Sequence, residues 1–280
     1  MTIVITGGTG TLGSHLVPLL TAAGHRVRVL SRQHHPDTAF VEYVRGDLET
    51  GAGLDEMVRG ATTVIHGAGS AKRDALKAKN LVSALQNSGD TAHLVFISVV
   101  GADSTPFRSA IDRATLGYFE QKQLAEREIV GSGIPWSILR ATQFNDFFVN
   151  LADLAKWMPV VPSFAGFHYQ PVDARDVAAR LAHLALGTPT GLIEELGGPR
   201  TYPMEVLLRD YLRARGRRRV VVPMRVPGAA AKAQRAGANL TPEHADGVRT
   251  WEAFIDEVES QIDPKDSDGR GAAIRRATLN

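Results

Sequence analysis

A tyrosine and a lysine, Tyr118 and Lys122, stand four residues apart in the chain. On a helix this spacing places both side chains on the same face. An ammonium group near a phenol lowers the pKa of the phenol, which would make Tyr118 a proton donor near neutral pH. Ser98 ends a predicted strand and could orient a substrate carbonyl or share the charge that develops on it. We predict that these three residues are catalytic; the alternative is that the tyrosine and lysine only cover a surface.

Three glycines, Gly7, Gly10 and Gly13, follow the first apolar run and precede a helical pattern. This order predicts a strand, a tight turn and the start of a helix. Backbone without side chains at Gly7 and Gly10 can approach a pyrophosphate closely, and free N–H groups at the start of the helix near Thr11 would face its negative charge. A plain glycine-rich loop is the alternative. The position directly between strand and helix favours dinucleotide binding.

The residue that would choose between two dinucleotides is Arg32, which lies 19 residues beyond Gly13, after a strand predicted at 25–30. An acid near this position would bind the ribose 2′-hydroxyl of NAD, whereas an arginine can bind the 2′-phosphate of NADP. No carboxylate lies between Arg26 and Asp37. We therefore expect NADP as the cofactor, with NADPH preferred over NADH; a solvated surface arginine is the alternative.

Strand and helix patterns alternate along most of the chain, which predicts an α/β fold of the Rossmann type: a doubly wound parallel sheet with helices on both faces. Ligands of such sheets gather beyond the carboxyl ends of the strands. The predicted strands are 2–6, 25–30, 41–44, 62–66, 93–98 and 136–139, with another ending at 194–198. The predicted helices are one that begins near Thr11 and ends at Gly24, and those at 54–58, 71–86, 116–130 and 173–186.

Three regions follow from this pattern. Residues 1–142 form the predicted dinucleotide-binding core, and residues 143–262 return to the sheet and form a smaller C-terminal substrate lobe. Residues 263–280 are polar and are expected to be poorly ordered. Aromatic side chains are frequent between 143 and 170, where they indicate either a hydrophobic cap or a substrate pocket. The expected partner is a small molecule of apolar or aromatic character.

Composition limits the remaining possibilities. The chain has 280 residues, of which 44% are hydrophobic, and a formal net charge of +2. It can bury a large core, and its overall charge does not favour a nucleic-acid partner. No apolar stretch approaches the ~20 residues of a membrane span. We therefore expect a soluble, cytoplasmic protein, a monomer or homodimer, with no membrane or nucleic-acid partner. The arginine-rich segment 213–219 is interpreted as a solvated helix end.

Several other chemistries lack the residues that they require. The chain has no cysteine, which excludes disulfides, thiolate metal sites and cysteine nucleophiles. It has no His-Glu-x-x-His pattern, so no metal site is expected. The Gly-x-Ser-x-Gly turn of hydrolases and the phosphate loop of nucleotide hydrolases are also missing.

Four features carry a resemblance to a known family: the glycine turn, Arg32, the triplet Gly46-Asp47-Leu48 and the stretch from Tyr118 to Arg140. Through them the chain resembles the atypical short-chain dehydrogenase/reductases, specifically the NmrA-like group with an NAD(P)-binding domain. The resemblance covers roughly residues 1–260. It implies cofactor contacts at Gly7, Gly10, Leu12, Gly13, Arg32, Asp47, Leu48, Ala68 and Lys122. Position at the predicted strand ends adds Thr9, Thr11, Gly67, Gly69, Ser98, Ala141, Thr142, Gln143 and Phe144.

Two functions are compatible with this resemblance. The first is an NADPH-dependent oxidoreductase that transfers hydride to a small carbonyl, a quinone or a conjugated acceptor. The alternative is a non-catalytic NADP(H)-binding regulator or redox sensor of the NmrA-like type. Ser98 lies 20 residues before Tyr118, farther than the resemblance implies, and is the weakest of the three catalytic residues. Because the chain keeps both Tyr118 and Lys122, we favour the enzyme.

Overall fold

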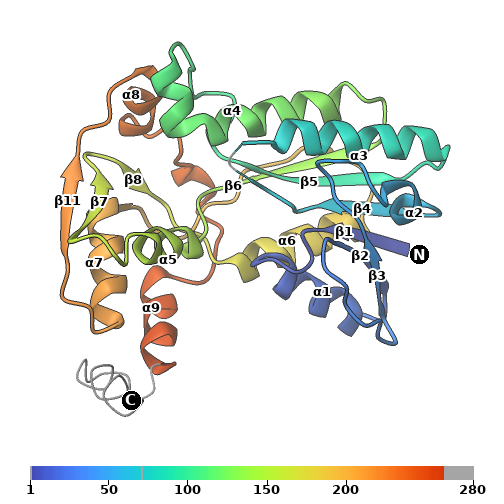
Figure 1. Ribbon diagram of the computed structural model, residues 1–280, viewed down its shortest axis with the longest axis horizontal. Coiled ribbons are helices and arrows are strands. Elements are labelled where there is room, and N and C mark those ends of the chain that lie inside the picture. Colours follow the sequence, from blue (N-terminus) through green and yellow to red (C-terminus); the bar gives the residue numbers. More distant parts are fainter. Residues whose placement is uncertain (1, 71, 262–280) are drawn as a thin grey trace, which may run out of the picture.

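The computed structural model describes residues 2–70 and 72–261. Its larger part is built on a sheet of seven parallel strands in the order β3-β2-β1-β4-β5-β6-β9 (Figure 1). The strands are β1 (Thr2–Thr6), β2 (Arg26–Ser31), β3 (Val41–Arg45), β4 (Thr63–His66), β5 (His93–Val99), β6 (Trp136–Ala141) and β9 (Gly191–Leu192).

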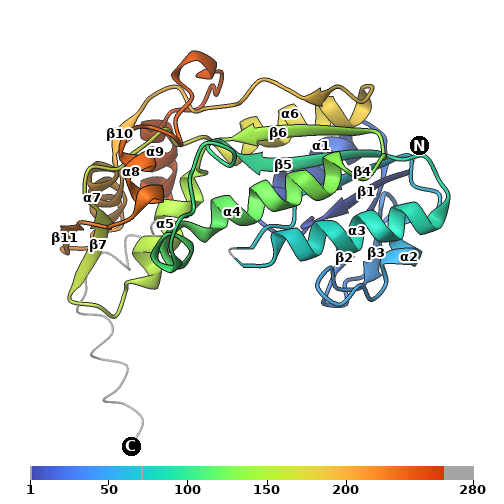
Figure 2. The ribbon, with the colours of Figure 1, turned by 90° about the horizontal axis from the view of Figure 1, so that it is seen from above.

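Helices cover both faces of this sheet. Figure 2 shows α3 and α4 on one side and α1 and α6 on the other. The short helix α2 packs on the side of α3. The predicted doubly wound Rossmann-type fold is therefore confirmed. The bounds are α1 (Gly13–Ala22), α2 (Leu54–Val58), α3 (Asp74–Ser88), α4 (Ala110–Val130) and α6 (Ala174–Leu186).

Both faces of the central strands are buried, which explains their nearly continuous apolar sequence. All seven residues of β5 are buried. Alternate residues of that strand divide between the two layers: Val95 and Ile97 join the core under α1 and α6, whereas Leu94 and Phe96 join the core under α2, α3 and α4. This two-sided packing fixes the register of the strands, and with it the positions of the loops at their carboxyl ends.

The smaller part of the molecule has its own core. Four large aromatic side chains, Phe148, Phe167, Tyr169 and Trp251, are at most 3% exposed and belong to one cluster. Phe148 contacts Tyr169 and Trp251 edge to face. The elements here are α5 (Asn145–Leu154), β7 (Val160–Phe164), β8 (His168–Tyr169), β10 (Tyr202–Pro203), α7 (Met204–Ala214), β11 (Val220–Met224), α8 (Ala229–Arg235), a 3-10 turn (Pro242–His244) and α9 (Trp251–Ser260).

Several predicted boundaries differ by one to three residues, as for the helix predicted at 71–86, which is α3 (Asp74–Ser88), and two predicted elements differ more. Helix α4 begins at Ala110 instead of Leu116, because Ser109 and Asp112 form a reciprocal capping box inside a segment whose composition is typical of a loop. Leu116 itself has a non-helical φ of −130°, which interrupts the helix. The last strand of the sheet is 191–192, and 194–198 contributes only a single bridge to β6. The predicted polar tail 263–280 lies outside the described residues.

Candidate functional site

The glycine turn between β1 and α1 has the close backbone contacts that its sequence predicts. Gly7 has a φ of +75°, and a Cβ at this position would lie 2.7 Å from the backbone nitrogen of Ala68. A Cβ at Gly13 would lie 2.4 Å from the carbonyl oxygen of Gly7. Only glycine fits at either position. The turn therefore packs tightly against the loop that follows β4.

The start of α1 leaves backbone donors free. No side chain caps the helix, and among the described residues the N–H groups of Thr11 and Leu12 have no acceptor. Gly10 instead donates to Gly7 within the turn, at 3.0 Å. Free N–H groups at a helix N-terminus form a site for an anion such as a pyrophosphate. The residues present fit a dinucleotide at this turn.

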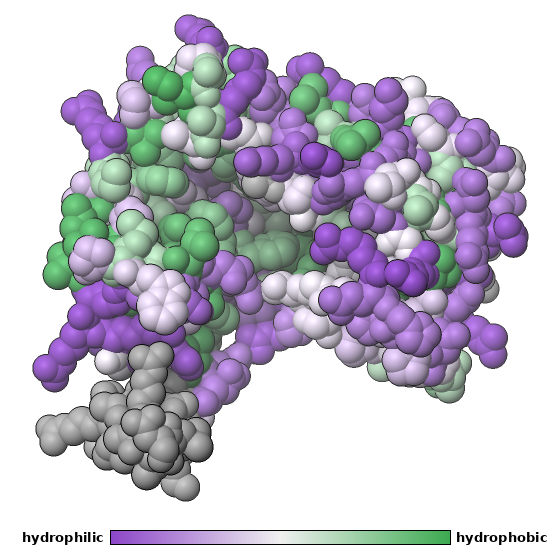
Figure 3. Space-filling model, in the orientation of Figure 1, coloured by the Kyte–Doolittle hydropathy of each residue, from purple (hydrophilic) through white to green (hydrophobic). Residues whose placement is uncertain are grey.

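The predicted site residues lie at the carboxyl ends of the strands or in the segments that follow them, except for Tyr118 and Lys122, which lie on α4. Arg32 follows β2, Asp47 and Leu48 follow β3, and Ser98 is the last residue but one of β5. The loop after β4 carries Gly67, Ala68 and Gly69, and the segment after β6 carries Thr142, Gln143 and Phe144, preceded by Ala141. Figure 3 shows the surface hollowed between the sheet and the smaller part of the molecule. Cofactor contacts at these positions stay a prediction.

Lys122 is buried beside this edge in an ion pair that the sequence did not indicate. Its side chain is 3% exposed, and its Nζ lies 3.2 Å from Oδ2 of Asp74, which is 1% exposed. The ammonium also donates to the carbonyl oxygen of Ile97 at 3.0 Å. Oδ1 of Asp74 accepts from the backbone of Ser70 at 2.5 Å. Asp74 thus joins the loop after β4 to α4.

The ion pair of Lys122 and Asp74 lies close to Gly69 in the loop after β4, where cofactor contacts are predicted. A Cβ at Gly69 would lie 3.5 Å from the Lys122 ammonium and 3.6 Å from the Asp74 carboxylate. Burial alone would lower the pKa of Lys122, but the negative charges of an ionised Tyr118 and of Asp74 outweigh it, so the pKa is raised. Lys122 is therefore a permanent cation at the strand ends.

Tyr118 does not have the electrostatic environment that we expected. Burial raises the pKa of its phenol, and the opposing effect of Lys122 is smaller, while Asp74 adds to the increase. The predicted lowering of the Tyr118 pKa toward neutrality is therefore wrong. Lys122 lies 5.8 Å from the ring centroid of Tyr118, on the same helical face as predicted. The phenol is held protonated at neutral pH.

Three buried polar side chains near the strand ends have atoms without a hydrogen-bond partner among the described residues. Ser98 is 4% exposed, and its Oγ has none. Asn145, which begins α5, has none at either amide atom. His66 bonds Thr6 through Nδ1 at 2.7 Å, but its Nε2 has none. Such orphaned groups indicate positions where a ligand or an ordered water completes the site.

His66 and Asn145 are functional candidates that were not among the predicted catalytic and cofactor residues. Burial lowers the pKa of His66 to about 3, with a further contribution from Lys122, so its ring is neutral. The ring stacks on Phe96 at a centroid distance of 5.2 Å. The position of His66 at the end of a buried strand was the available signal, because a polar residue there reaches the ligand edge of the sheet.

Arg140, at the end of the stretch that carries the resemblance, has a structural role. Its guanidinium makes two hydrogen bonds with Glu126, at 2.9 and 2.7 Å, and a third with Asp103 at 2.6 Å. Both Arg140 and Glu126 have side chains that are 9% exposed. This fork joins β6 to α4 and fixes the helix that carries Tyr118 and Lys122.

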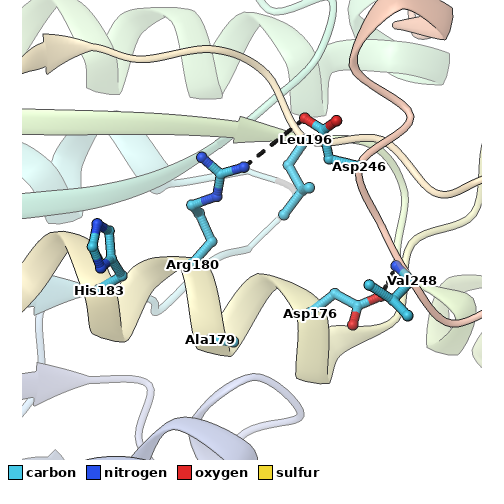
Figure 4. Close-up of a pocket in the computed structure, with 7 residues that line it drawn as sticks. All are labelled: Asp176, Ala179, Arg180, His183, Leu196, Asp246 and Val248. Carbon is cyan, nitrogen blue, oxygen red and sulfur yellow. Dashed lines mark hydrogen bonds and ion pairs between the residues drawn. The ribbon is translucent and has the colours of Figure 1, made fainter.

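A separate hollow of about 430 Å³ lies along α6 (Figure 4). Arg180 and Asp246 face each other across it at 3.9 Å, and Asp176 holds the backbone N–H of Val248 at 2.9 Å. None of the predicted cofactor residues lines it. The seven lining residues are Asp176, Ala179, Arg180, His183, Leu196, Asp246 and Val248.

Residues 2–70 and 72–261 contain neither a metal-binding cluster nor a membrane-spanning helix. No group of three or more His, Cys, Asp or Glu side chains in these segments could hold a metal ion. No helix in them is both long and apolar enough to cross a membrane.

Comparison with known proteins agrees with this geometry. The NADPH-dependent quinone oxidoreductase of Escherichia coli, solved with NADPH, is similar over 91% of this chain and 99% of its own, with a TM-score of 0.71 and 17% identity. UDP-glucose 4-epimerase of Thermus thermophilus, solved with NAD, is similar over 89% of this chain and 100% of its own, with a TM-score of 0.63 and 23% identity. At these identities the similarity establishes the fold.

One curated protein matches part of the sequence more closely. Over 85 residues the chain is 45% identical to ceramide reductase of Caulobacter vibrioides. The match spans 29% of this chain and only 27% of the length of that relative.

The parallel sheet, the glycine turn and the free donors of α1 define a dinucleotide-binding protein of the Rossmann class. A family model described as NAD(P)H-binding matches residues 7–184. The chain belongs to this NAD(P)H-binding family, which confirms the NAD(P)-binding domain that the resemblance implied.

Proposed function

We propose that the protein is an NADPH-dependent reductase that delivers hydride to a quinone, a conjugated acceptor or a small carbonyl compound. The observation that carries the proposal is the buried Lys122 ammonium, held by Asp74 beside the Gly69 loop at the carboxyl edge of the sheet. A fixed cation at this edge can both hold the ribose of a dinucleotide and stabilise negative charge that develops on an acceptor oxygen. Family membership supports the cofactor, and the fold of the quinone oxidoreductase supports the reaction class.

Preference for NADPH over NADH is supported by the surroundings of Arg32. Its side chain is exposed after β2, and among the described residues it has no ion-pair partner. The register of β2 with β3 places Arg45 beside Ser31, so a second cation lies close to the same corner. The nearest acid in the sequence after it, Asp37, accepts a hydrogen bond from the backbone of Tyr43 at 2.8 Å. A 2′-phosphate would therefore meet positive charge there.

The residues of the chain have distinct roles in this proposal. The bound nicotinamide would supply the hydride. Lys122 stays protonated and presents positive charge, while Asp74 fixes its position. Tyr118 stays protonated because its pKa is raised, so its hydroxyl can donate a hydrogen bond to the acceptor oxygen. For an acceptor whose reduced oxygen is strongly basic, the same hydroxyl can transfer its proton.

A quinone is the acceptor whose reduction requires the least proton transfer from these residues. Its reduced oxygen is a phenolate, which is far less basic than the alkoxide formed from a simple ketone. Orientation and charge stabilisation by Lys122 then suffice, and no proton needs to leave Tyr118 during hydride transfer. The raised pKa of Tyr118 therefore favours a quinone or an extended conjugated acceptor over a simple ketone.

The test is a screen for acceptor-dependent loss of NADPH absorbance with purified protein, using a naphthoquinone, an enone and an aromatic ketone. We expect turnover with the quinone to exceed turnover with the ketone. Lys122→Met should lose turnover in this screen while it remains folded, as judged by circular dichroism. Tight NADPH binding without turnover of any acceptor would refute the reductase.

That outcome would support the second candidate, a non-catalytic NADP(H)-binding regulator. One observation favours it: two polar partners, Asp74 and the carbonyl of Ile97, already occupy the Lys122 ammonium. In a regulator this network would only hold the loop after β4 in place. Both functions predict that the protein binds NADPH, but only the reductase predicts turnover of an acceptor.

A further inference from the structure

The smaller part of the molecule exposes an apolar surface that the site does not use. Trp157 is 87% exposed and Leu154 is 82% exposed, next to Met158 at 48%. On β11, Val220 is 64% exposed and Met224 is 56% exposed. We call this surface the Trp157 face; it consists of Leu154, Trp157, Met158, Val220, Val222 and Met224.

These residues come from two segments that lie side by side. Strand β11 pairs with β7 in parallel, with Val220 opposite Val160. Val221 is buried, so the alternate residues Val220, Val222 and Met224 point outward together. The Arg219 guanidinium donates to the carbonyl oxygen of Ala155 at 2.6 Å, which ties β11 to the segment that carries Trp157. Figure 3 shows hydrophobic residues gathered along this edge of the molecule.

The two segments are also strongly basic. Residues 153–160 and 204–225 contain eight lysines and arginines and three carboxylates, so they carry a formal net charge of +5 in a chain whose total is +2. Two of the carboxylates are already paired with arginines. Lys156, Arg218 and Arg225 are exposed and lie within two residues of Trp157, Val220 and Met224 in the chain, and Arg215 is exposed at the end of α7. The Lys156 ammonium lies 5.5 Å from the Trp157 ring.

The positive charge and the exposed apolar area together indicate which kind of partner fits the Trp157 face. A second copy of this chain docked on the same face would bring the two positive segments together, and like charges would oppose the contact. A nucleic acid would satisfy the arginines but would gain little from Leu154, Met158 and Val220. An anionic lipid surface satisfies both, because basic side chains bind its headgroups while tryptophan and aliphatic side chains enter the interface.

We propose that the Trp157 face docks the protein reversibly on membrane surfaces that contain anionic lipid. The contact is peripheral and needs no spanning helix. It departs from the partner prediction made from the sequence, which was based on the lack of an apolar stretch long enough to span. It does not depend on the reductase activity, because binding to lipid can be measured without turnover.

The experiment is flotation of the full chain with vesicles of phosphatidylcholine, with or without phosphatidylglycerol. We expect binding to the mixed vesicles that weakens as salt is raised, and little binding to the neutral ones. The emission of Trp157 should shift to the blue on binding. Trp157→Phe should remove most of that shift while it keeps most of the flotation, which identifies the reporter.

Paired variants separate the two contributions. Leu154→Ser with Trp157→Ser should weaken vesicle binding about tenfold or more, because two large side chains no longer enter the interface. Arg215→Ala with Arg218→Ala should weaken it roughly 25-fold at low salt, at roughly fivefold for each charge. Val248→Ser is the matched control, because Val248 is 81% exposed but lies outside the face. It should bind as the wild type does.

Three results would overturn the proposal. One is equal binding to neutral and anionic vesicles. Another is loss of binding in Val248→Ser to the same extent as in the paired apolar variant. The third is retention on a single-stranded oligonucleotide without flotation on anionic vesicles, which would assign the basic segments to nucleic acid. Thermal melting of each variant shows whether it is folded, and these exposed positions should leave the midpoint unchanged.

Discussion

The substitution Asp74→Asn tests the centre of the site most directly. It keeps the shape of the side chain and an oxygen that can accept from Ser70, but it removes the negative charge that faces Lys122 at 3.2 Å. At an effective dielectric of about 20, the attraction across this distance is about 5 kcal/mol. Breaking one partner of a buried pair leaves an uncompensated charge and typically costs about 3–5 kcal/mol. We expect a loss of unfolding free energy within that range.

The assay is urea denaturation of the wild type, Asp74→Asn, Lys122→Met and the double variant. Asp55→Asn, an exposed carboxylate on α2, is the control and should change the unfolding free energy by less than about 0.5 kcal/mol. The double variant removes both charges, so it should be more stable than Asp74→Asn alone. A loss below about 1 kcal/mol in Asp74→Asn, or losses that simply add in the double variant, would refute a tightly coupled pair.

Asp74→Asn should also reverse the way in which Lys122 makes the unfolding free energy depend on pH. In the wild type the Lys122 pKa is raised above 10.5, so its contribution to stability is present below that pH and is lost only as pH rises through the higher folded value. Tyr118 can attract the ammonium only when it is ionised, and its raised pKa keeps it neutral below about pH 9. Without Asp74, burial therefore dominates in this range and the folded pKa falls below the unfolded one. The unfolded state then binds the extra proton, and stability should increase from about pH 7 to about pH 9, by up to about 1.4 kcal/mol per pH unit. A pH profile parallel to that of the wild type would contradict this assignment.

Three further predictions concern single side chains. Arg32→Ala should weaken NADPH binding about tenfold and leave NADH binding unchanged, as measured by fluorescence titration; equal losses for both would remove the assigned role. Tyr118→Phe should lower kcat with an aromatic ketone by about 10²- to 10⁴-fold, with little effect on a quinone or on NADPH affinity, and a uniform loss across acceptors would argue against proton donation. His66 has a folded pKa of about 3, below its unfolded value of 6.5, so its protonation favours unfolding. The unfolding free energy should therefore fall between about pH 6.5 and about pH 3, and His66→Gln should show a shallower decrease in urea titrations at each pH.

Much of the sheet could be predicted because its signal is local. Strands such as β4 and β5 are buried on both faces, so they read as short apolar runs bounded by turns, and the glycine turn follows from contacts with its immediate surroundings. The start of α4 was harder. Its capping box lies in a segment rich in serine and aspartate, and the non-helical Leu116 divides the helical pattern where the prediction began.

The electrostatics of the site could not be predicted in the same way, because its partners are distant in sequence. Asp74 and Lys122 are 48 positions apart and meet only because α3 and α4 pack on the same face of the sheet. The spacing of Tyr118 and Lys122 correctly indicated a shared helical face, but it carries no information about burial or about a third charge. Those two factors determine the direction of the Tyr118 pKa.

The aromatic segment 143–170 is a second case in which the sequence could not give the environment of the side chains. Sequence left open whether these side chains form a cap or a pocket, and the structure divides them. Phe148, Phe167 and Tyr169 fill the core of the smaller part, while Trp157 stands almost fully in solvent. Helical spacing cannot distinguish these environments, since it reports which residues share a face and not what that face meets. Trp157 could be interpreted only once its exposure, its apolar neighbours on β11 and the surrounding arginines were seen together.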